Sequence, residues 1–130
     1  MIETRLQEES INGVKVFKTY ANIAQLKLDP NNPRDISEDK LDELIDFLSK
    51  YNPLKPVLVD VRPEKEGQII GGNMRLKAFH RMGLQEIWIE PKDPVTDAQA
   101  FEMGTLDNME FGIYMADKLK IEALKYEGDI

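Results

Sequence analysis

The segment from Ile69 to His80 constrains the fold more than any other part of the sequence, because it joins a strand to a helix through two glycines. Residues 69–70 are apolar and β-branched, which is typical of a strand, and Gly71 and Gly72 follow directly. Residues 73–82 then repeat apolar side chains at helical spacing. The sequence therefore predicts a strand, a turn and a helix in direct succession, with unpaired backbone N–H groups and partial positive charge at the helix start.

The start of this predicted helix has the chemistry of an anion site. Paired glycines let an anionic group approach the backbone closely, and Arg75 and Lys77 add positive charge in the first turns. The alternative is a plain tight turn, in which Arg75 faces solvent or pairs with a carboxylate. Asn73 can cap the helix in either case. Taken alone, these residues favour the tight turn.

Helices and strands alternate along the rest of the chain. Apolar periodicity, caps and turn residues predict strands at 14–20, 57–61, 68–70 and 86–90, and helices at 38–51, 73–82, from 97 through 106, and at 115–126. Residues 1–20 are expected to form an N-terminal arm or edge element and the first strand, and residues 21–130 a single compact domain. This alternation without repeats predicts an α+β domain built on a small mixed sheet.

Composition excludes several classes of function. The chain has 17 basic and 24 acidic residues, a net charge of −7, which argues against broad binding of DNA phosphates. It has no cysteine, which removes disulfides, thiolate zinc sites and a cysteine nucleophile, and a single histidine, His80. No apolar run approaches the length of a signal core or a membrane span, so we expect a cytoplasmic protein without membrane contact.

Several short segments, in their order along the chain, resemble the N-terminal domain of the ParB/sulfiredoxin superfamily. They are Asn32-Pro33-Arg34, Pro56-Val57-Leu58-Val59, Gly72-Asn73-Met74-Arg75-Leu76-Lys77-Ala78 and Leu84-Gln85-Glu86-Ile87-Trp88-Ile89. The resemblance covers roughly residues 20–125. It implies the α+β fold of that superfamily, a small mixed β-sheet packed with helices.

Partition-type members of this superfamily carry the box Gly-Glu-Arg-Arg-x-x-Ala, which contacts the triphosphate of CTP. Here Gly72, Arg75 and Ala78 match the box, whereas Asn73 and Met74 replace the glutamate and the first arginine. The resemblance implies a site for a nucleotide of the CTP or ATP type, or for another phosphate-bearing ligand. Its residues would be Gly71, Gly72, Asn73, Arg75 and Lys77, with Arg34 closing the site from the preceding loop.

A second family box, Glu-Asn-x-x-Arg, helps to hold the metal and the phosphates. It corresponds to Asp107-Asn108-Met109-Glu110-Phe111, which keeps the acid–amide pair and lacks the arginine. The resemblance implies that Asp107 binds Mg²⁺ together with the nucleotide, and that Asp107 and Asn108 support at most weak nucleotide hydrolysis. The alternative is that this pair only ends one helix before the next begins.

Sulfiredoxins have a cysteine at the position of Asn73. Because this chain has no cysteine, repair of sulfinic acids by that route is excluded. The sequence Gly-Gly-Asn-Met-Arg is similar to that of phage and mobile-element members of the superfamily, which occur with DNA methyltransferases. It implies a role in DNA modification, partition or packaging, with DNA contacted indirectly or weakly. Two alternatives stay open: a ParB-like metal-dependent nuclease, and a non-enzymatic adaptor that binds a methyltransferase or another phage protein. The resemblance is compatible with a homodimer.

Overall fold

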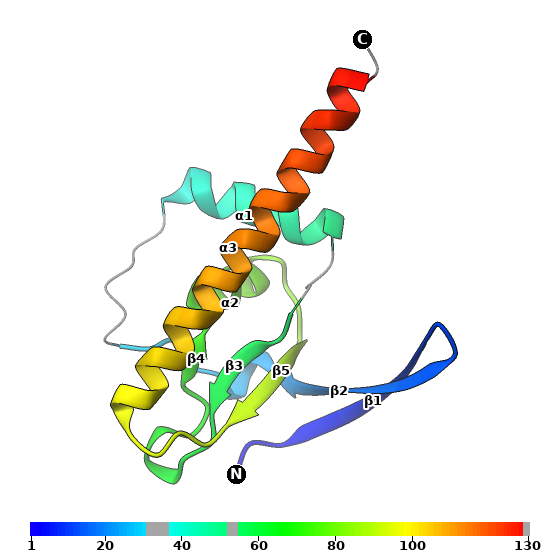
Figure 1. Ribbon diagram of the computed structural model, residues 1–130. Coiled ribbons are helices and arrows are strands. Elements are labelled where there is room, and N and C mark those ends of the chain that lie inside the picture. The colour runs from blue at the N-terminus through cyan, green and yellow to red at the C-terminus, as the bar shows by residue number, and fades with distance from the viewer. Residues whose placement is uncertain (31–36, 52–54, 129–130) are drawn as a thin grey trace.

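The computed structural model describes residues 1–30, 37–51 and 55–128, with side chains as far as Gly112. The strands are β1 (Thr4–Ile11), β2 (Val14–Asn22), β3 (Val57–Asp60), β4 (Ile69–Gly71) and β5 (Glu86–Lys92) (Figure 1). The helices are α1 (Glu38–Tyr51), α2 (Asn73–Arg81) and α3 (Asp97–Gly128), with short 3-10 turns η1 (Ile23–Gln25) and η2 (Pro63–Lys65). The predicted α+β class is confirmed. In the described ranges, no helix is both long enough and apolar enough to cross a membrane.

One mixed sheet holds the five strands in the order β1-β2-β5-β3-β4. The strands pair antiparallel except β3 and β5, which run parallel. A parallel pair needs a long crossover, and β4 and α2 lie in the connection between these two strands. All four residues of β3 are buried, as expected for a strand in the middle of the core.

The core lies between the sheet and helices α1 and α2. Leu41, Leu44 and Leu48 form the buried face of α1, as the apolar stripe predicts, and Phe47 joins them. Ser37 precedes α1 and its hydroxyl accepts a hydrogen bond from the backbone N–H of Lys40, which caps the helix as predicted. On α2, Leu76, Ala78 and Phe79 face the same core.

The polar N-terminal residues form an edge strand. β1 pairs with β2 along its whole length, and the hairpin extends away from the rest of the sheet (Figure 1). The turn is Asn12-Gly13, and both residues have positive φ values, 52° and 80°. Asn-Gly is the preferred sequence for such two-residue hairpin turns, so the turn residues explain why the chain reverses here.

A single helix replaces the two C-terminal helices that the sequence predicts. α3 runs without interruption through Asp107 and Asn108, so the expectation that this pair ends a helix is wrong. Aspartate breaks helices by bonding nearby backbone groups, whereas the Asp107 side chain is buried and contacts Arg75 and Lys55 on other parts of the chain. α3 crosses the sheet beside β4, and its C-terminal part extends beyond the body of the molecule (Figure 1).

Candidate functional site

The two glycines between β4 and α2 allow very close packing. Gly72 has a left-handed conformation, φ +108°, and a Cβ on it would lie 3.1 Å from Arg75 Nη2. A Cβ on Gly71 would lie 2.6 Å from Asp107 Oδ2. Both positions therefore need glycine, and the predicted succession of strand, tight turn and helix is confirmed.

The start of α2 has no side-chain cap. Gly72 is the N-cap residue, and no described side chain accepts a hydrogen bond from the first turn. Asn73, which the sequence suggests as the cap, is instead the first helical residue. Its Oδ1 accepts a hydrogen bond from the backbone N–H of Asp29 at 2.8 Å, which ties the segment after η1 to the start of α2. The N–H groups of the first turn and their partial charge are left to a ligand or to water.

Arg75 is part of the core in this structure. Its side chain is 2% exposed, Nη2 donates a hydrogen bond to Asp107 Oδ2, and Nη1 donates to the backbone oxygens of Lys55 and Pro56 at 3.3 Å. The guanidinium also lies 4.4 Å from the centre of the Phe111 ring. Burial lowers the pKa of Arg75, against the opposing effect of Asp107. Of the two sequence-based alternatives, pairing with a carboxylate matches this geometry.

Both oxygens of the Asp107 carboxylate face cations. Oδ2 receives the hydrogen bond from Arg75, and Oδ1 lies 2.7 Å from Lys55 Nζ. Lys55 also pairs with Glu110 at 2.8 Å. Burial opposes the charge of Lys55, but its contacts with Asp107 and Glu110 outweigh burial and raise its pKa. Sequence reasoning missed Lys55, which carries no motif signal of its own.

This arrangement does not suit Asp107 as a metal ligand. The Asp107 side chain is 1% exposed and both of its carboxylate oxygens already have cationic partners. In addition, the described part of the chain contains no group of three or more His, Cys, Asp or Glu side chains that could hold a metal ion. Mg²⁺ prefers several free oxygen ligands, and these residues do not offer them.

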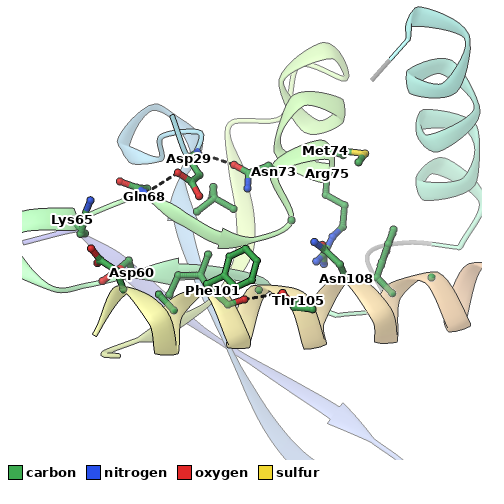
Figure 2. Close-up of a pocket in the computed structure, with 18 of the residues that line it drawn as sticks. Asp29, Asp60, Lys65, Gln68, Asn73, Met74, Arg75, Phe101, Thr105 and Asn108 are labelled. Atoms are coloured by element: carbon green, nitrogen blue, oxygen red, sulfur yellow. Dashed lines mark hydrogen bonds between the residues drawn. The ribbon is translucent and has the colours of Figure 1, made fainter. Parts of the chain in front are cut away.

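A cleft of about 640 Å³ opens at the start of α2 (Figure 2). It lies between α2, α1, the turn after β3 and the first half of α3. Its lining residues are Asp29, Lys40, Glu43, Leu44, Asp60, Arg62, Lys65, Gln68, Ile69, Ile70, Gly72, Asn73, Met74, Arg75, Asp97, Ala100, Phe101, Gly104, Thr105, Asn108, Phe111 and Gly112. Small-molecule sites in proteins commonly have volumes in the range of ~300–1,000 Å³, so the cleft can hold one.

The cleft brings together some of the predicted site residues and separates others. Gly72, Asn73, Arg75 and Asn108 line it. Gly71, Lys77 and Asp107 do not belong to its lining, because Gly71 and Asp107 are buried against each other and Lys77 lies elsewhere on α2. Arg34 lies outside the described residues.

Two lysines in the cleft were not predicted from the sequence. Lys40 on α1 is exposed and Lys65 in η2 is half-buried, and neither side chain has an ion partner in the ranges described. They supply accessible positive charge, which Arg75 does not. Only the fold brings these two lysines into the cleft that opens at the start of α2, so no sequence pattern could have linked them to the site.

A second ion network forms one wall of the cleft. Arg62 donates hydrogen bonds to Asp60 Oδ2 at 2.8 Å and to Asp97 Oδ1 at 2.9 Å. The bond to Asp60 is the main cause that raises the pKa of Arg62, and burial opposes it. The network ties the first residue of α3 to the end of β3, and thereby holds α3 against the cleft.

The fold and this cleft define a small α+β domain whose helix start can receive an anionic ligand. Residues 5–109 match the model of the ParB N-terminal domain. The chain therefore belongs to the ParB N-terminal domain family, which confirms the broader part of the predicted resemblance. No curated protein sequence matches the chain.

Solved structures agree with this assignment. The chain is similar to the C-terminally truncated chromosome-partitioning protein ParB from Caulobacter crescentus complexed with CTP-gamma-S, with a TM-score of 0.60 and 30% identity over 70% of this chain and 52% of that one. The same protein complexed to the centromeric parS site gives a TM-score of 0.53 and 32% identity, over 68% and 46% of the two chains. A Pnob8-like ParB-N domain shares the fold, with a TM-score of 0.51 and 21% identity over 79% and 37%. The chain thus spans about half, or less, of the length of these proteins.

Proposed function

We propose that the cleft binds a nucleoside triphosphate, of the CTP type, or another phosphate-bearing ligand, with the phosphates at the start of α2. The observation that carries the proposal is that the cleft opens onto the uncapped first turn of α2 at Gly72 and Asn73. Unpaired N–H groups and the positive end of the helix dipole favour anions at such a position. The CTP analogue bound to the similar Caulobacter protein supports a nucleotide as the ligand.

Accessible polar side chains of the cleft complete the proposed site. Lys40 and Lys65 would neutralise phosphate charge from two walls, and Asn108 would donate a hydrogen bond from α3. Asn108 is exposed and its side chain has no hydrogen-bond partner among the residues described, so its amide is available to a ligand. Arg75 and Asp107 then act as positioning residues that hold α2 against α3. The proposal assigns no divalent cation to Asp107.

The broader role that we propose is in DNA modification, partition or packaging in a phage or mobile element. Membership of the ParB N-terminal domain family supports a connection with DNA, and one similar protein is complexed to the centromeric parS site. The sequence Gly-Gly-Asn-Met-Arg at the start of α2 supports the phage branch. The net charge of −7 favours indirect or weak contact with DNA.

Calorimetric titration with CTP, ATP, GTP and ADP in the presence of Mg²⁺ tests the nucleotide site. We expect the wild type to bind at least one nucleoside triphosphate, and Asn108→Ala to weaken that binding about 10-fold or more, because a hydrogen bond to a charged group is lost. Glu102→Ala is the matched control, because Glu102 is an exposed residue of the same helix that does not line the cleft.

Arg75→Ala would be a poor probe, since it leaves Asp107 buried without one of its cations and weakens the fold itself. The absence of heat from a wild type shown to be folded would contradict the nucleotide proposal. That result would favour the adaptor alternative, which needs no ligand in the cleft.

A further inference from the structure

Phe101 is a large apolar side chain that the fold leaves at the edge of the cleft. It lies in the second turn of α3 and is 76% exposed, more than any other phenylalanine in the described ranges. Figure 2 shows the ring pointing from α3 toward the strands, on the side of the cleft that also holds Asp60. No aromatic neighbour stacks on it among the described residues. The ring therefore presents an open face to whatever occupies the cleft.

The cleft is larger and more apolar than phosphate groups require. Leu44, Ile69, Ile70 and Met74 line it in addition to the polar groups at the start of α2. At about 640 Å³ it has the size of a site for a whole small molecule. Phosphates at Gly72 and Asn73 would leave the apolar side chains of the lining to the remainder of the ligand.

We propose that Phe101 is a stacking platform for the heterocyclic base of the nucleotide. This inference rests on the proposed function, and it narrows the ligand from any phosphate-bearing molecule to one with a planar ring. Bases stack well on aromatic side chains, and every base offers a π-face. Phe101 therefore raises affinity for nucleotides over bare polyphosphates, and it does not by itself select among the bases.

The test compares Phe101→Ala with the wild type in two measurements. In the first, proton NMR follows the base protons of CTP during titration, because stacking on an aromatic ring shifts them upfield. In the second, calorimetry gives the dissociation constants for CTP and for inorganic tripolyphosphate. Phe17→Ala is the matched control, because Phe17 is 62% exposed on β2 and does not line the cleft.

We expect Phe101→Ala to abolish the upfield shift and to weaken CTP binding about 5- to 150-fold, the range for loss of one base–aromatic stack. Tripolyphosphate binding should not change, Phe101→Trp should restore the shift, and Phe17→Ala should behave as the wild type. Unchanged CTP binding and an unchanged shift in Phe101→Ala would overturn the ring subsite and leave the phosphate site standing. Failure of the folded wild type to bind any nucleotide would overturn both proposals.

Discussion

Arg75 and Asp107 form the most deeply buried ion pair among the residues described, with side chains 2% and 1% exposed. Burying two charges costs solvation free energy that their attraction only partly offsets, so such a pair is weak evidence for high stability. Removing one partner is a different matter, because it leaves an uncompensated charge in the core. The pair therefore makes the contact between α2 and α3 sensitive to substitution of either residue.

Asp107→Ala should lower the free energy of unfolding by about 3–5 kcal/mol, because Arg75 then stays buried without its carboxylate. Urea denaturation followed by circular dichroism measures this change. Combining it with Arg75→Met should cost less than the sum of the two single changes, since the residues are in direct contact. A loss no larger than that of the exposed control Glu102→Ala would show that the pair does not hold the helices together.

The sequence predicts where Arg75 lies but not what it does. Its place in the first turn of a helix after two glycines follows from local pattern, and the structure confirms that local structure. Its partner Asp107 lies 32 residues away in sequence, and only the packing of α3 on β4 brings the two together. The local pattern suggests that the Arg75 guanidinium is available to a ligand, but in the folded protein it is already paired with Asp107. The exposed Lys40 and the half-buried Lys65 are missed for the same reason, because their position in the cleft depends on the fold.

At the scale of elements, α3 packs so closely on β4 at Gly104 that a side-chain atom there would not fit. A Cβ on Gly104 would lie 2.3 Å from the backbone oxygen of Ile70, a contact that only movement of the helix or the strand can relieve. Gly112 lies two turns later in the same helix, and a Cβ there would meet nothing within 4 Å. The two glycines thus separate the effect of close packing from the effect of helix propensity.

Gly104→Ala should therefore destabilise the protein by about 1–3 kcal/mol through overpacking. Gly112→Ala should be neutral or stabilise by up to about 1 kcal/mol, since alanine favours a helix over glycine. Thermal and urea denaturation of both variants provide the comparison. Equal effects of the two substitutions would mean that β4 and α3 adjust freely to one another.

Most elements follow from local signals, and the exceptions have a common cause. The Ser37 cap and the apolar stripe of α1 predict that helix well, and the β-branched run of β3 predicts its strand. The continuity of α3 through Asp107 was not predictable, because an Asp-Asn pair favours a helix end unless its side chain is engaged elsewhere. The order of the strands in the sheet likewise cannot be predicted from local sequence patterns, since it depends on which strands pair across long connections.

At the scale of the whole molecule, two ion pairs link separate elements and respond to acid. Arg81 on α2 donates hydrogen bonds to Glu38 on α1 and lowers the pKa of that carboxyl. Lys55 likewise lowers the pKa of Glu110 on α3, mainly through its hydrogen bond. Both pKa values in the folded protein thus lie below 4.5, the ordinary value for glutamate.

A carboxyl whose folded pKa is depressed contributes stability that is present above its unfolded pKa and is lost as pH falls through its folded value. We therefore expect the urea concentration at the midpoint of unfolding to be constant near neutral pH. It should decrease when the pH is lowered below 4.5. The double variant Glu38→Gln, Glu110→Gln should be slightly less stable at neutral pH and should lose less stability on acidification. An identical acid response in the variant and the wild type would rule out these pairs as a cause of acid sensitivity. Because both glutamates are exposed, the effect should be small and should weaken with added salt.

The order of the strands also sets the sequence in which the sheet can be completed. Among the described strands, the β1–β2 hairpin joins the rest of the sheet only through β5, which is synthesised after α1, β3, β4 and α2. A nascent chain on the ribosome can close the local hairpin early, but the hairpin can pair fully with β5 only after residues 86–89 have emerged. Closing so long a loop carries an entropic cost before any contact offsets it, and high contact order slows folding. The edge of β2 that pairs with β5 therefore stays unpaired while residues 23–85 are being synthesised.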